Sequence, residues 1–132
     1  SAAGGARMLL RLGEVRAVQL LVSPQVLDEL EGAVRRKAPH TLGLLALLLE
    51  RSGLQVVPSP TADSVRQVQA LVHHLGDAQF LAAAWDSEAD YFVTMDQRHF
   101  LGNADLKGRA PFMIGTPGDF IAWYRSQFAI QK

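Results

Sequence analysis

The sequence predicts one α/β domain over residues 1–132, with helices on both faces of a mostly parallel central sheet, a three-layer α/β/α arrangement. Short apolar segments alternate with longer segments that have the apolar spacing of helices, and this alternation is typical of a parallel sheet. The run Tyr91–Val93 is apolar without a polar alternate, as expected of a strand covered on both faces. The chain is long enough for one core, and a second domain would not fit comfortably.

Composition and charge exclude several classes of protein. Thirteen basic residues balance thirteen acidic ones, so the chain is not a strongly basic binder of polyanions. No cysteine occurs, which excludes disulfides and thiolate metal sites and permits a reducing compartment such as the cytoplasm. The run Leu44–Leu49 is far shorter than the roughly 20 residues of a membrane span, so we expect no membrane partner.

The first third of the chain predicts helix, strand and helix. Ala6–Leu12 is expected to end a helix, with Gly13 as its stop. Ala17–Val22 (AVQLLV) follows as a strand. Ser23 and Pro24 are expected to open the next helix as cap and first residue, and that helix should run to Lys37.

The next helix, Thr41–Arg51, is apolar almost all round. We expect it to be buried or paired with a neighbour. The neighbour is either another helix of the same chain or a second protein molecule, such as a dimer partner. Gly53 should end the helix, before a strand over Leu54–Val57.

Thr61 is expected to cap a helix that turns Val65, Val68 and Val72 toward the core and that Gly76 breaks. The remaining predicted elements are a helix over Asp77–Glu88, strands over Tyr91–Val93 and Phe112–Ile114, and a closing helix over Pro117–Phe128.

A carboxylate, Asp96, stands just beyond the apolar strand Tyr91–Val93. Ligands of open parallel sheets bind beyond the carboxyl ends of the strands, so Asp96 is a candidate site residue. The structural alternative is that Asp96 begins a turn or caps the segment Gln97–Leu101.

A second carboxylate, Asp77, leads the helix that precedes this strand. At about 100° per residue it projects toward the middle of the helix's apolar face. A helix cap is the structural alternative, but a cap does not need to align with the buried face. The apolar face consists of Phe80, Leu81, Ala84 and Trp85.

A third acid is expected from the stretch VLDELEG, which offers Asp28, Glu29 and Glu31. The apolar stripe of this helix places Glu29 and Glu31 on opposite flanks, so periodicity does not choose between them. Each of these acids, taken alone, is more often a solvated helix residue than a ligand.

Carboxylates from separate segments repel one another when folding brings them together, and a divalent cation removes that cost. Oxygen ligands suit Mg²⁺ or Mn²⁺. Such an ion can activate a water and stabilise charge on a phosphodiester.

Three segments resemble the PIN-domain family, especially bacterial toxins of toxin–antitoxin pairs. They are SPQVLDELEGAVRRK, then GDAQFLAAAWDSEADYFVTMDQRHFL, then IGTPGDFIAW, and together they span nearly the whole chain in order. The resemblance implies a PIN-like three-layer fold and a cytoplasmic, metal-dependent endoribonuclease with RNA as substrate and an antitoxin as partner. It selects Glu29 from its cluster, supports Asp77 and Asp96 as metal ligands, and makes Thr94 a residue that orients the site.

The sequence departs from the family pattern at two places, and each departure leads to a structural expectation. The family begins with a central strand that ends in a metal-binding Asp, and no counterpart precedes Ser1 in the sequence. We therefore expect the gap in the sheet either to close by rearrangement or to borrow pairing from a second copy, as a homodimer. At His99 the family commonly has an acid; we expect this histidine to be exposed, with phosphate contact as the alternative.

The remaining polar signals are less specific. Arg98, Lys107 and Arg109 follow the Asp96 corner and are candidates for contact with an RNA backbone, although such residues usually lie in solvated loops. Adjacent helix residues point about 100° apart, so His73 and His74 are expected not to converge on one ion.

Two other functions are alternatives to the nuclease. A degenerate PIN-like module that binds RNA or a protein is the alternative, supported by the absent Asp. A phosphoryl-accepting Asp96 is disfavoured because Arg98 stands where haloacid dehalogenase-like phosphatases have their second Asp, and because the paired early acids of receiver domains are missing.

Overall fold

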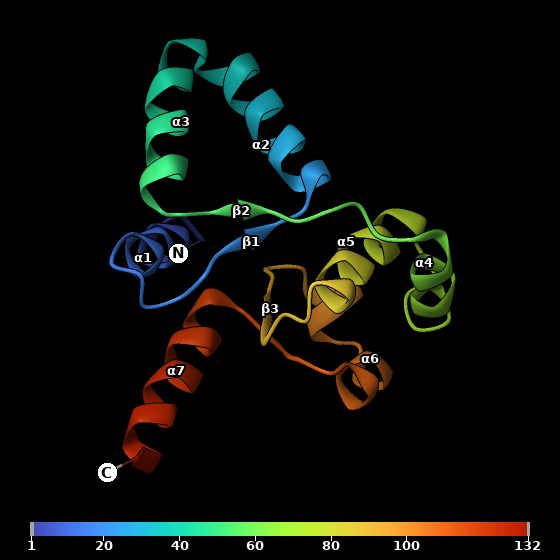
Figure 1. Ribbon diagram of the computed structural model, residues 1–132. Helices are drawn as coiled ribbons and strands as arrows, with labels where there is room; N and C mark the ends of the chain where they lie inside the picture. Colours follow the sequence, from blue (N-terminus) through green and yellow to red (C-terminus); the bar gives the residue numbers. More distant parts are fainter. Residues whose placement is uncertain (1, 132) are drawn as a thin grey trace.

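The computed structural model describes residues 2–131 of the chain and the side chains of residues 4–128. It confirms the mixed α/β class, since helices alternate with short strands along the chain (Figure 1). The helices are α1 (Ala2–Glu14), α2 (Pro24–Lys37), the 3₁₀ turn η1 (Pro39–Thr41), α3 (Leu42–Arg51), α4 (Ala62–Gln69), α5 (Leu75–Asp86), the π-helical turn η2 (Gln97–Leu101), α6 (Ala104–Arg109) and α7 (Pro117–Gln131). The strands are β1 (Leu21–Val22), β2 (Gln55–Val56), β3 (Tyr91–Val93) and β4 (Met113–Gly115).

The strands form two separate parallel pairs rather than one central sheet. Leu21 of β1 lies opposite Gln55 of β2, and Tyr91 of β3 lies opposite Met113 of β4. Within residues 2–131 no ladder joins β1 to β3, so the gap expected from the sequence is not closed by rearrangement. Each pair consequently keeps unpaired strand edges, which folded proteins usually cover.

The start of α2 follows the prediction. The Ser23 side chain accepts a hydrogen bond from the Val26 N–H at 3.2 Å, and Pro24 occupies the first turn, where its missing N–H is not needed. The helices α2 and α3 project as a hairpin from the β1–β2 pair (Figure 1). Neither helix contains a buried residue, so α3 is paired with a neighbour but not buried.

Two predicted helix breaks are wrong, because α1 runs through Gly13 and α5 begins at Leu75, before Gly76. Gly13 serves close packing instead: a Cβ there would lie 2.5 Å from the Ser52 carbonyl oxygen, just beyond α3. Gly53 does end α3, with φ of 68°. The predicted strand Ala17–Val22 is also too long, since only Leu21 and Val22 pair.

The core lies in the second half of the chain. Val68 and Val72 are buried as predicted, and Val65 packs against them. They meet α5 and the aromatic residues that follow β3. The other buried members of this cluster are Ala78, Leu81, Ala82, Phe100, Leu106 and Phe112. This core fixes the start of α5 close to the end of β3, where the predicted acids stand.

Candidate metal centre

Thr94 fixes the backbone at the point where β3 ends. Its N–H donates to the Gly115 carbonyl at 2.9 Å, which extends the pairing with β4 by one residue. Its Oγ1 accepts a hydrogen bond from the Asp96 N–H at 3.0 Å. The side chain predicted to orient the site therefore holds the backbone of Asp96.

Asp96 caps the π-helical turn η2 and contacts His99 twice. Its Oδ1 accepts a hydrogen bond from the His99 N–H at 3.0 Å, and its Oδ2 lies 2.9 Å from His99 Nδ1. The backbone N–H, followed by the imidazole, lowers the pKa of Asp96 and keeps its carboxyl ionised. The capping alternative is thus confirmed for Asp96. The cap uses Oδ1, so Oδ2, which contacts the His99 side chain, is still a candidate ligand atom.

Asp77 lies in the first turn of α5 but does not cap it, because the residue before the helix is His74. Its side chain is 16% exposed, and its Oδ2 is shielded from solvent without a hydrogen-bond partner. This oxygen lies 3.4 Å from His99 Nδ1, close enough for charge attraction but outside hydrogen-bond geometry. A carboxylate oxygen left in this state costs free energy unless a positive charge compensates it.

Asp77, Asp96 and His99 form a compact group, here called the acid–histidine cluster. One ligand atom of each residue lies within 4.8 Å of the other two. The structure therefore brings together two of the three predicted acids, from α5 and from the end of β3.

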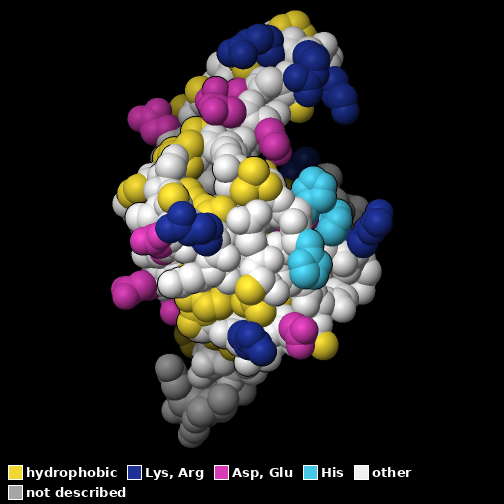
Figure 2. Space-filling model, turned by 90° about the vertical axis from the view of Figure 1, so that its right-hand side faces the viewer, with side chains coloured by type: hydrophobic (Ala, Val, Ile, Leu, Met, Phe, Trp, Pro, Cys, Tyr) yellow, Lys and Arg dark blue, Asp and Glu magenta, His cyan; other side chains and the backbone are white. Residues whose placement is uncertain are grey.

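The expectation that His99 is simply exposed is wrong. Its side chain is 39% exposed and contacts both carboxylates. The reason is the tight turn after β3: Phe100 is buried in the core, and the turn brings the residue at position i+3 back over Asp96. The spacing from Asp96 to His99 carries this signal in the sequence. The His74 ring lies 5.9 Å from the His99 ring, and histidine side chains gather on this face (Figure 2).

Glu29 lies outside the acid–histidine cluster, on the exposed surface of α2. One contact relates its helix to α5: the Gln25 Nε2 donates to Gln79 Oε1 at 2.6 Å. Residues four apart share a helix face, so Glu29 follows Gln25 on the face that turns toward α5. A role for Glu29 at the site stays a prediction.

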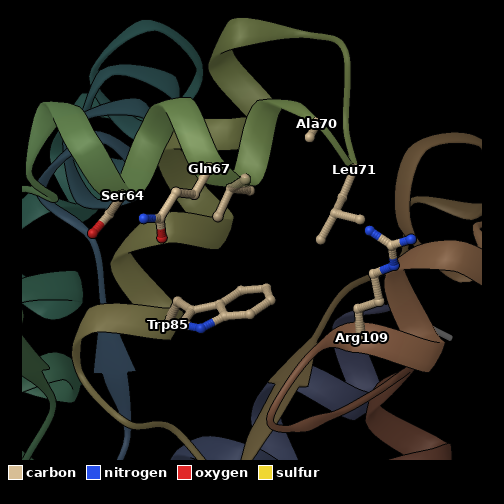
Figure 3. Close-up of a pocket in the computed structure, with 7 residues that line it drawn as sticks. Ser64, Gln67, Ala70, Leu71, Trp85 and Arg109 are labelled. Carbon is tan, nitrogen blue, oxygen red and sulfur yellow. The ribbon is translucent and has the colours of Figure 1, made fainter.

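The predicted basic residues Arg98, Lys107 and Arg109 are exposed. Hydrogen bonds from Thr116 lower the pKa of Asp119, and the nearby positive charge of Lys107 lowers it slightly further. Arg109 lines a hollow of about 210 Å³ together with Trp85 and Gln67 (Figure 3). Neither Asp77 nor Asp96 lines this hollow, so it is separate from the acid–histidine cluster. RNA contact by Arg98, Lys107 and Arg109 stays a prediction.

Among the helices of residues 2–131, none has the length and apolar character required to cross a bilayer. No protein-family model matches the chain, and neither the curated proteins nor the solved structures contain a significant match.

Proposed function

We propose that the chain is a PIN-type, divalent-metal-dependent endoribonuclease that hydrolyses RNA phosphodiesters, as the toxin of a cytoplasmic toxin–antitoxin pair. One observation supports this most: the carboxylates of Asp77 and Asp96 converge from two segments, and the Asp77 Oδ2 has neither solvent nor a hydrogen-bond partner. Two carboxylates within 4.8 Å repel by about 3 kcal/mol at the effective dielectric constant of about 20 near a protein surface. Mg²⁺ or Mn²⁺ removes that repulsion and accepts oxygen ligands.

The residues take distinct roles in this proposal. Asp77 and Asp96 would hold the cation, and Glu29 would contribute from α2. Thr94 positions Asp96 through the backbone hydrogen bond at 3.0 Å. A bound divalent cation supplies charge for the scissile phosphate and lowers the pKa of water enough to provide a nucleophile at neutral pH.

The finer architecture belongs to the same proposal. Both strand pairs are parallel, as a PIN-like three-layer α/β/α domain requires of its sheet. A strand that joined the open edges of β1 and β3 would complete that sheet, and a second copy of the chain is the proposed source. The protein would then act as a homodimer, with an antitoxin as its other protein partner.

The test is cleavage of a fluorescent single-stranded RNA in the presence of Mn²⁺. We expect D96N and D77N each to lower the rate by about 100-fold or more, because they remove the charges that hold the cation. The substitution E29Q should lower it by about tenfold. D28N on the same helix is the matched control and should stay within about threefold of the unchanged chain. Cleavage that persists in EDTA, or in D96N, contradicts the proposal.

A degenerate module that binds RNA without cutting it is the second candidate. It is favoured by one observation: only two carboxylates belong to the acid–histidine cluster among the described side chains. Filter binding of the same RNA separates the two functions. Retention of RNA without cleavage, equal in D96N and the unchanged chain, would support the binding module.

A further inference from the structure

We propose that His99 is the third ligand of the metal centre and makes it prefer cations that accept nitrogen, such as Mn²⁺, Co²⁺ or Zn²⁺, over Mg²⁺. This inference rests on the metal site of the proposed function. It adds a nitrogen ligand to the two carboxylates and thereby changes which metal ions the site binds.

The distances from His99 to the two carboxylates fit ligands of one ion. Two ligand atoms that each lie about 2.1 Å from a metal, at tetrahedral or octahedral angles, are separated by about 3.0 to 3.4 Å. His99 Nδ1 lies 2.9 Å from Asp96 Oδ2 and 3.4 Å from Asp77 Oδ2. Both distances from the imidazole nitrogen are therefore close to the spacing that coordination requires, and the two carboxylates lie within 4.8 Å of each other.

The backbone presents His99 in this position. The His99 N–H donates to Asp96 Oδ1, and the adjacent Phe100 is buried and packs on Phe92 with ring centroids 5.2 Å apart. The imidazole thus needs little reorganisation to bind, and ligands held in place bind more tightly than mobile ones.

A protonated His99 could instead serve as an internal counter-ion for the two carboxylates. The two roles predict opposite effects of removing the ring. A ligand contributes affinity, so its loss weakens metal binding, whereas a counter-ion competes with the metal, so its loss strengthens binding.

The ligand chemistry sets the selectivity. Imidazole suits Zn²⁺, Co²⁺ and other first-row cations, while Mg²⁺ prefers oxygen and gives up its waters reluctantly. An oxygen–oxygen–nitrogen site should therefore rank Co²⁺ and Zn²⁺ above Mn²⁺, and Mn²⁺ above Mg²⁺, whereas replacing the nitrogen with a third carboxylate should shift it toward Mg²⁺.

The test is titration of the full chain with Co²⁺, Zn²⁺ and Mg²⁺ by calorimetry, with the Co²⁺ absorption band as a second readout. We expect H99N to weaken Co²⁺ and Zn²⁺ binding by about tenfold or more, within the range for lost metal-site interactions, and Mg²⁺ binding by less than about threefold. H99D should favour Mg²⁺ and change the Co²⁺ band. H73N, at an exposed histidine, is the matched control and should behave as the unchanged chain.

Equal or tighter binding of Co²⁺ by H99N would overturn the proposal and identify His99 as the counter-ion. A measurement on the unchanged chain covers the case in which the variants unfold: Co²⁺ should shift the imidazole ¹⁵N resonances of His99, and unshifted resonances at saturation would also overturn the proposal. Failure of the proposed nuclease function can be told apart from failure of this inference. If metal binding depends on His99 but the chain does not cleave RNA, only the proposed function is refuted. If the chain cleaves RNA but metal binding does not depend on His99, only this inference is refuted.

Discussion

At the scale of single residues, Asp77 is the side chain whose surroundings most need an explanation. Its position in the first turn of α5 is favourable, because a carboxylate near a helix N-terminus gains about 0.3 to 1 kcal/mol. The repulsion from Asp96, about 3 kcal/mol at their separation, is larger. His99 offsets this only in part, since its Nδ1 forms a hydrogen bond with Asp96 and not with Asp77.

We therefore predict that D77N stabilises the metal-free protein, by about 1 to 2 kcal/mol, because it removes a shielded charge that lacks a hydrogen-bond partner. Thermal unfolding followed by circular dichroism in EDTA measures the change. With Mn²⁺ in place of EDTA, the midpoint of the unchanged chain should rise and that of D77N should stay unaltered.

D105N is the control for this prediction. Asp105 also lies in the first turn of a helix, α6, but is exposed and outside the acid–histidine cluster. Its loss should cost a few tenths of a kcal/mol at most, the size of a surface helix-dipole interaction. If D77N is less stable than the unchanged chain in EDTA, the charge of Asp77 does not destabilise the metal-free fold.

At the scale of elements, the start of α7 depends on a reciprocal cap between Thr116 and Asp119. The Thr116 N–H donates to Asp119 Oδ2 at 2.9 Å, and the Asp119 N–H donates to Thr116 Oγ1 at 3.1 Å. The backbone N–H of Thr116, then its hydroxyl, lowers the pKa of Asp119. This pair is a capping box, with an aspartate as the acid.

The lowered pKa predicts a loss of stability in acid. Asp119 contributes stability that is present above the unfolded-state value of about 4 and is lost as the pH falls through the lower folded value. The unfolding midpoint of the unchanged chain should therefore exceed that of D119N at pH 7, and the difference should shrink as the pH falls below about 4. A difference that is constant from pH 7 to pH 2 would contradict the role of ionised Asp119.

The elements also show what the sequence could predict. Caps and buried stripes depend on local chemistry, so Ser23, Thr61 and the valines of α4 were predicted correctly. The convergence of Asp77 and Asp96 followed from helix periodicity and from the place where a parallel strand ends. Strand pairing depends on distant segments. For this reason the predicted strand Ala17–Val22 is too long, and two separate strand pairs occur where one central sheet was predicted. His99 was not predicted as a site residue, because the direction of its ring depends on the tertiary burial of Phe100 as well as on its spacing from Asp96.

At the scale of the whole molecule, the two halves of the chain differ in how many of their residues are buried. The core gathers around α4, α5 and the β3–β4 pair, whereas α2 and α3 have no buried residue. On α3, Leu44, Leu47 and Leu48 are exposed at the spacing of one helix face. An apolar stripe on an open hairpin, beside unpaired strand edges, favours self-association.

We predict a concentration-dependent dimer, about twice the 14.4 kDa mass of the chain, in sedimentation-velocity experiments. The substitution L44E, at a side chain that is 57% exposed, should shift the equilibrium toward monomer by about tenfold. V15E, at a side chain that is 71% exposed but lies in the turn after α1 and not on α3, should have no such effect. A chain that stays monomeric up to about 100 μM, a concentration at which a weak micromolar dimer would form, excludes this surface as a dimer interface.

The most direct measurement is a crystal structure of the Mn²⁺-soaked protein with anomalous scattering data. The acid–histidine cluster predicts an anomalous peak between Asp77 and Asp96, about 2.2 Å from one oxygen of each carboxylate. A protein that is saturated with Mn²⁺ but has no peak between these two side chains would contradict the metal centre and, with it, the proposed nuclease.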